Sequence, residues 1–132
     1  MTLIFCLDDE YGIAFGGRRQ SRDRELNADI LKDAVGKKLY MSAYSAKLFD
    51  GADIQIAEAP SAQQDIYFLE LKSPMDYITL ANRVIVYRWN RHYPSDVRFD
   101  AKLSEIGFKL SESYDIAGFS HEKITKEIYE RL

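Results

Sequence analysis

The sequence contains few of the residues that build disulfides and metal centres, with one cysteine and two histidines among its 132 residues. A disulfide framework needs paired cysteines, and a zinc site needs about four cysteine, histidine or carboxylate ligands at suitable spacing. Cys6 lies inside an apolar segment, where a buried thiol is the ordinary state. We therefore expect neither a disulfide framework nor a zinc centre.

Long apolar runs and an excess of positive charge are also missing. No segment approaches the ~20 apolar residues of a membrane-spanning helix, and no basic segment followed by a long apolar one opens the chain. The formal net charge of −3 disfavours bulk nucleic-acid binding, which usually requires a positive field. We expect a cytoplasmic protein without a membrane partner, formed by one α/β domain over residues 1–132.

The segments that are present alternate between strand and helix patterns. We expect strands at 2–7, 39–41, 53–57, 66–71, 84–87 and 108–110. We expect helices at 21–35, 43–49, 74–81, 100–107 and 120–132. This mixed alternation favours a layered α/β sandwich, with a mixed or mostly parallel sheet flanked by helices.

Charged and aromatic side chains follow two of the expected strands, and a glycine pair leads into a basic cluster. The carboxyl ends of neighbouring parallel strands meet at one edge of a sheet, so these segments would share a rim. Tryptophan and arginine in loops are typical interface anchors. The predicted partner-binding residues are Asp8, Asp9, Arg18, Arg19, Trp89 and Arg91. The alternative is that the arginines pair with nearby acids in a surface ion network.

The strongest enzymatic pattern is Glu70-Leu71-Lys72 at the end of an expected strand, with Asp53 on the strand before it. Restriction-endonuclease-like nucleases use such an arrangement, in which the two acids bind Mg²⁺ and the lysine orients or activates a water. Glu-x-Lys also arises often by chance. The triad Asp53, Glu70 and Lys72 is therefore kept as a rival catalytic hypothesis.

Four segments resemble those of a group of short, stand-alone bacterial proteins that are often labelled ribonuclease Z. The segments are 6–9, 17–24, 87–96 and 117–129, and the resemblance is weakest from about Asp50 to Lys72. It implies a bacterial, cytoplasmic protein. It does not imply zinc chemistry, because the His-x-His-x-Asp-His motif of true ribonuclease Z is missing and the histidines, His92 and His121, lie far apart.

A small, acidic, aromatic-rich chain of this kind is typical of a protein-binding module. We expect an immunity-type inhibitor that neutralises a basic partner such as a nuclease toxin and needs no cofactor, since charge complementarity speeds such association. One alternative is a small nuclease or phosphodiesterase that uses Mg²⁺. The other is a nucleotide- or RNA-binding protein that uses Arg18, Arg19 and Trp89.

Overall fold

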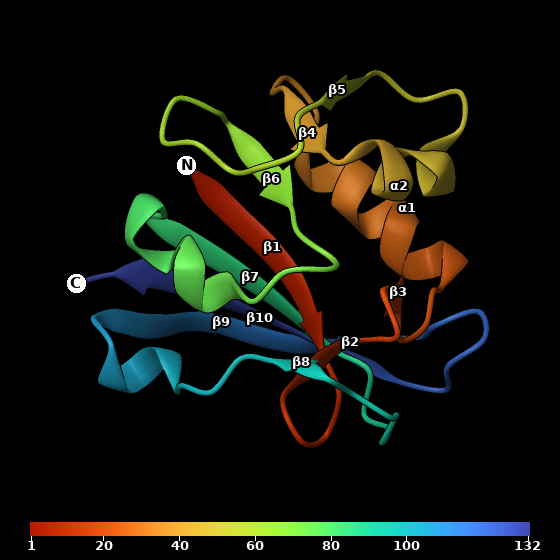
Figure 1. Ribbon diagram of the computed structural model, residues 1–132, viewed down its shortest axis with the longest axis vertical. Coiled ribbons are helices and arrows are strands. Elements are labelled where there is room, and N and C mark those ends of the chain that lie inside the picture. Colours follow the sequence, from red (N-terminus) through yellow and green to blue (C-terminus); the bar gives the residue numbers. More distant parts are fainter.

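The computed structural model describes all 132 residues and is organised around a seven-stranded sheet (Figure 1). The strand order is β5-β4-β6-β1-β7-β10-β9, and only β10 runs against the other strands. The strands are β1 (Thr2–Leu7), β4 (Leu39–Met41), β5 (Ile54–Ile56), β6 (Ile66–Phe68), β7 (Arg83–Arg88), β9 (Phe108–Ile116) and β10 (Ile124–Arg131). A mostly parallel mixed sheet with few helices confirms the predicted α/β class.

A second, three-stranded sheet lies where β1 ends (Figure 1). It contains β2 (Gly12–Phe15), β3 (Arg18–Arg19) and β8 (Val97–Arg98), in the order β3-β2-β8. Gly16 and Gly17 connect β2 to β3 with φ values of 59° and 74°. A two-residue hairpin turn with positive φ at both positions favours glycine. The glycine pair therefore makes a hairpin, rather than leading directly into a helix.

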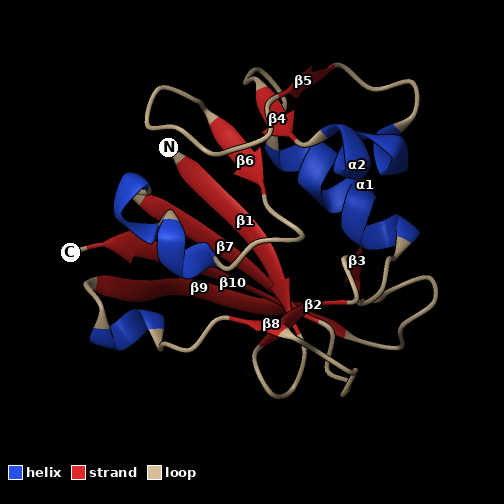
Figure 2. Ribbon diagram, in the orientation of Figure 1, coloured by secondary structure: helices blue, strands red, loops and turns tan.

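The two faces of the main sheet pack against different layers (Figure 2). Helix α1 (Arg24–Asp33) covers one face with Leu26 and Ile30, both buried. The other face packs against β2, Phe99 and the short 3-10 turns that contain Ile78 and Leu103. Because β7 lies between these layers, its four central residues are all buried, as its continuous apolar character predicts.

The C-terminal segment differs from the sequence-based expectation. Residues 120–132 were expected to form a helix, but they contain strand β10, which pairs with β7 and β9. Ile124 and Ile128 face inward, and a spacing of four satisfies both a helical period and the strand period of two. Lys126 also faces inward and is only 1% exposed, so the outer-face charge pairs of a helix do not form.

The other helices are shorter than expected. Helix α1 is capped by Asp23 rather than Ser21, and α2 (Ala43–Ala46) continues only into a 3-10 turn at Lys47–Phe49. Further 3-10 turns, at Pro74–Asp76, Ile78–Leu80 and Leu103–Glu105, replace the helices expected at 74–81 and 100–107. No helix has the length and apolar character needed to cross a membrane.

Candidate functional site at the carboxyl edge of the sheet

A crevice lies between the β2–β3 hairpin and the carboxyl ends of β1, β6 and β7. An ion pair between Arg19 and Glu70 fills most of it. Arg19 of β3 donates from Nε to Glu70 Oε2 over 2.9 Å and from Nη2 to Oε1 over 3.1 Å. Ser45 Oγ donates to the same carboxylate over 2.7 Å, and the guanidinium lies 4.3 Å from the centre of the Tyr44 ring. The space that remains is about 10 Å³, which is room for about one water.

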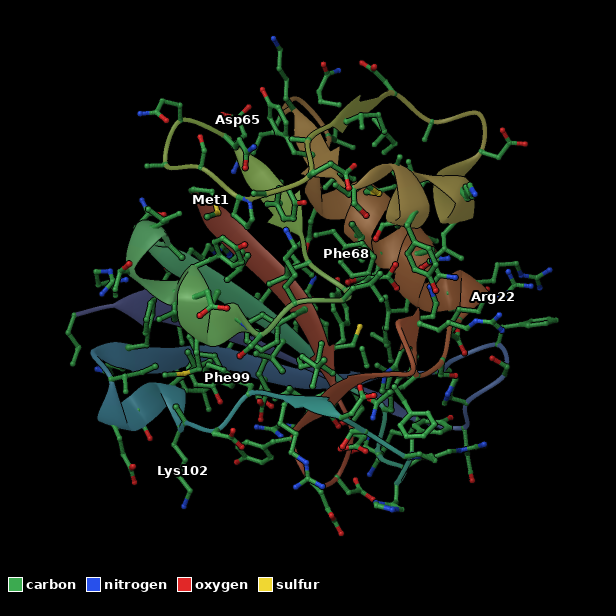
Figure 3. The ribbon with its side chains drawn as sticks, viewed as in Figure 1. Met1, Arg22, Asp65, Phe68, Phe99 and Lys102 are labelled. Atoms are coloured by element: carbon green, nitrogen blue, oxygen red, sulfur yellow. The ribbon has the colours of Figure 1, made fainter.

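An open groove lies beside this closed crevice. It has a volume of about 560 Å³ and is formed by the start and exposed side of α1, residues 47–50 and the loop before β10. Arg22, Arg24 and Lys47 line it, and none of them forms an ion pair with an acidic group. Arg22 lies at the edge of the molecule near the start of α1 (Figure 3). The Asp23 and Asp50 carboxylates line the groove as well, so three cations and two acids leave a net charge of +1, and the three cations form no ion pair within the fold.

Apolar side chains give this groove a surface that water solvates poorly. Phe119 is 64% exposed and Leu31 is 36% exposed. The guanidinium of Arg24 stacks over the Phe119 ring, with Cζ 3.7 Å from the ring centre. An arginine held over an aromatic face keeps its N–H edge free for a ligand.

Asp23 holds the wall of the groove in place. Its carboxylate accepts hydrogen bonds from the N–H groups of Glu25, Phe119 and Ser120, each over 2.9 Å. It thereby caps α1 and ties the loop before β10 to the helix start. Burial alone would raise the pKa of Asp23, but these hydrogen bonds and the one from His121 hold it well below its usual value.

Two of the predicted rim residues, Asp8 and Trp89, are buried. Asp8 is 1% exposed and accepts hydrogen bonds from the N–H groups of Gly12 and Tyr93, over 2.7 and 3.1 Å. Although burial opposes the shift, these bonds lower the pKa of Asp8. Trp89 is 4% exposed and stacks on the His121 ring at 4.6 Å. Both organise the loops, so the expectation that they contact a partner is corrected.

The other rim residues are distributed between surface and interior. Asp9, Arg18 and Arg91 are exposed, and Asp9 N–H donates to the Arg91 carbonyl over 2.9 Å. The loops after β1 and β7 therefore lie side by side, because these strands are parallel neighbours. Arg19 is committed to Glu70. Partner binding by the three exposed residues stays a prediction.

The rival triad does not form a metal site. Asp53 lies beside β5 and Glu70 follows β6, and β4 separates these two strands. The Glu70 carboxylate is taken by Arg19 and Ser45, whereas Lys72 Nζ donates to the Glu58 carbonyl over 3.0 Å. No group of three or more His, Cys, Asp or Glu side chains is placed to hold a metal ion. The structure therefore does not bring the three residues of the magnesium-nuclease alternative together.

Sequence reasoning found part of the groove. The basic cluster 18–24 was noticed, but Lys47 and Phe119 were not linked to it, because each lies on a separate segment. Phe119 also directly precedes the helix expected at 120–132, which does not form. The sequence feature that could have indicated the groove is Phe119 itself, a large aromatic residue between Gly118 and Ser120, where a loop is expected.

The comparisons with known proteins identify the fold. No protein-family model matches the sequence, and no curated protein matches it. Among solved structures, the chain is similar to a dihydrofolate reductase from Enterococcus faecalis complexed with NADP(H) and RAB-propyl. The TM-score is 0.69 at 8% identity, covering 98% of this chain and 95% of that chain. The chain thus has a dihydrofolate reductase-like α/β fold.

This likeness overturns the expectation of an immunity-type inhibitor. That expectation depended on composition, size and an exposed Trp/Arg face. Over almost the whole chain the backbone instead follows the fold of a reductase, and Trp89 is interior.

The crevice residues do not fit a nicotinamide dinucleotide of the kind named for that reductase. Dinucleotide sites use a glycine-rich turn after a strand and a helix N-terminus with free N–H groups. Here the turn after β6 is Leu69-Glu70-Leu71-Lys72, and the Glu70 carboxylate fills the crevice. The Ala43 N–H at the start of α2 donates to Glu58 Oε2 over 2.9 Å. Two protein carboxylates thus repel phosphate groups from this edge.

Proposed function

We propose that this chain binds a small aromatic molecule bearing a carboxylate or another anionic group, in the groove along α1. The observation that carries the proposal is the set of unpaired cations, Arg22, Arg24 and Lys47, around an exposed apolar surface in a chain of net charge −3. A volume of about 560 Å³ suits a drug-sized ligand. The groove also adjoins the carboxyl edge of the sheet, where open α/β folds bind their ligands.

Each part of the groove has a distinct role in such binding. The guanidinium groups of Arg22 and Arg24 pair with a carboxylate through two parallel N–H donors, and Lys47 supplies a point charge. The Phe119 ring and the Leu31 side chain remove the aromatic body of the ligand from water. Dihydrofolate, the molecule in the name of the structural neighbour, has this chemistry of an aromatic body and carboxylates.

Hydride transfer from a nicotinamide is not part of this proposal, because the crevice does not fit the dinucleotide. The groove binds its ligand without the β2–β3 hairpin having to open, since the Arg19–Glu70 pair lies outside it.

Titration calorimetry with folic acid and with 8-anilinonaphthalene-1-sulfonate tests the proposal. Both probes are aromatic anions, so we expect saturable binding that weakens as salt is added. Arg24→Ala removes both a charge-assisted hydrogen bond and the partner of the Phe119 ring. We expect a loss of about tenfold in affinity, since hydrogen bonds to charged groups contribute about 1.5 kcal/mol or more.

Lys109→Ala is the charge-matched control, because Lys109 is exposed on β9 and does not line the groove. It should leave the affinity unchanged. Equal losses of affinity in Arg24→Ala and Lys109→Ala would show that the probes respond only to the net charge of the protein and not to the groove. Failure of both probes to bind at roughly millimolar concentration would contradict the proposal.

A further inference from the structure

Behind the groove, three side chains form a continuous hydrogen-bonded series. Ser21 Oγ lies 3.1 Å from His121 Nε2, and His121 Nδ1 lies 3.0 Å from Asp23 Oδ2. Ser21 and Asp23 come from the segment between β3 and α1, whereas His121 comes from the loop before β10. A hydroxyl, an imidazole and a carboxylate in this order are the arrangement by which a serine is activated as a nucleophile.

The surroundings decide which His121 nitrogen carries the proton. The Asp23 carboxylate already accepts several backbone hydrogen bonds, including one from the His121 N–H over 3.1 Å. An ionised carboxylate only accepts, so the proton of neutral His121 is on Nδ1. The lone pair of Nε2 then faces the Ser21 hydroxyl. Trp89 stacks on the ring, and His121 is 3% exposed, so its orientation is held by packing.

Tyr93 also reaches this centre. Its hydroxyl oxygen lies 2.9 Å from His121 Nε2 and 3.4 Å from Ser21 Oγ. When Tyr93 donates to Ser21 Oγ, the Ser21 hydroxyl is free to donate to Nε2. Tyr93 is therefore a positioning residue for Ser21.

Backbone donors for a developing oxyanion are adjacent to Ser21. The N–H groups of Ser21 and Arg22 form no hydrogen bond within the fold. In acyl transfer, the N–H of the nucleophile or of the next residue commonly stabilises the tetrahedral oxyanion. The cavity of about 10 Å³ that Ser21 lines has room for about one water and none for an ester. Ser21 is only half-buried, so an ester would reach its hydroxyl from the exposed side.

We propose that Ser21 is the nucleophile of an acyl-transfer site, with His121 as its general base and Asp23 as the group that orients His121. The substrate class is small activated esters. The Ser21 Oγ–carbon bond forms as the ester carbon–oxygen bond breaks, and the serine proton passes through Nε2 to the departing oxygen. Water then attacks the acyl group and gives a proton to Nε2. The bond between the acyl carbon and Ser21 Oγ breaks as Nε2 returns that proton to Oγ, and the carboxylic acid leaves.

The test uses the full chain, a fluorophosphonate probe and p-nitrophenyl acetate. We expect one equivalent of label, located on Ser21 by peptide mass spectrometry, and release of p-nitrophenolate. Ser21→Ala should abolish labelling, whereas Tyr93→Phe should slow labelling without abolishing it, because Ser21 Oγ then loses the hydroxyl that orients it.

Ser104→Ala is the matched control, since Ser104 is an exposed serine on a distant 3-10 turn. It should label like the unmodified chain. His121→Gln should slow labelling by about 100-fold or more, the usual effect of losing a general base. Thermal melts identify any variant that fails to fold, and the position of the label in the unmodified chain then provides the independent check. Label on another residue, no label, or label retained in Ser21→Ala would overturn the proposal.

Discussion

Replacing Lys126 by methionine tests how α1 is attached to the sheet. Lys126 of β10 is 1% exposed, and its Nζ lies 2.8 Å from Asp29 Oδ2 and 2.5 Å from Asp33 Oδ2. Both acids belong to α1, one helical turn apart. Tyr87 of β7 donates to Asp29 over 2.6 Å. One ammonium group therefore connects two carboxylates of the helix to the main sheet.

The expected loss of folding stability follows from the two carboxylates that Lys126→Met leaves without a cation. Methionine has a similar volume, so packing changes little, but Asp29 and Asp33 then face each other without a cation. Breaking a buried ion pair usually costs about 3–5 kcal/mol. The carboxylate side chains are 17% and 31% exposed, and this partial hydration favours the lower end, about 3 kcal/mol. For a domain of this size the melting temperature should fall by about 10 °C.

Urea unfolding of four proteins measures the interaction: the parent, Lys126→Met, the double variant Asp29→Asn/Asp33→Asn, and all three changes together. The triple variant should recover much of the loss, because it leaves no unpaired charge. Burial alone would lower the pKa of Lys126, but its hydrogen bonds to Asp29 and Asp33 raise it. The stabilisation should therefore be complete below about pH 10 and be lost at higher pH. A loss below about 1 kcal/mol in Lys126→Met, or no recovery in the triple variant, would refute the reasoning.

Three further outcomes are expected. Gly118→Ala would place a Cβ 2.4 Å from the His121 carbonyl oxygen, so urea unfolding should show a loss of about 1–3 kcal/mol, and unchanged stability would contradict the close approach. Glu70→Gln removes the anion that holds Arg19, so hydrogen exchange in the β2–β3 hairpin should accelerate while the remaining strands keep their protection. The pKa of Asp23 is lowered by folding, so its stabilisation is present above about pH 4 and is lost as the pH falls further, which urea midpoints between about pH 6 and 2 would reveal.

The local sequence pattern predicted secondary structure correctly where burial of apolar side chains alone decides it. The β1 and β7 strands are apolar along their length because both faces of the sheet are covered, and both were predicted from sequence. The side-by-side position of the loops after them followed from the rule for parallel strands. The mixed α/β class was predicted on the same grounds and is confirmed by the sheet.

The candidate site was only partly predictable, since its contacts join distant segments. Arg19 and Glu70 are 51 residues apart, and Ser21 and His121 are 100 residues apart. The sequence marks Arg19 as basic and Trp89 as a large aromatic, but exposure depends on what packs over each. The local sequence also does not decide which residue caps α1, since both Ser21 and Asp23 are good N-cap residues. Asp23 is the cap in the structure, where its carboxylate also accepts N–H groups from the loop before β10.

The sequence by itself determined the α/β class and the buried central strands β1 and β7, because these depend on the side-chain period of neighbouring residues. Tertiary structure alone decided that residues 124–131 form a strand. Their apolar spacing fits helix and strand equally. Pairing with the free edge of β7, and the half-buried carboxylates of Asp29 and Asp33 on α1, select the strand that turns Lys126 inward. It likewise decided that Glu70 closes the crevice and that the cations along α1 stay free, because the partners of a charge are set by long-range packing rather than by neighbours in sequence.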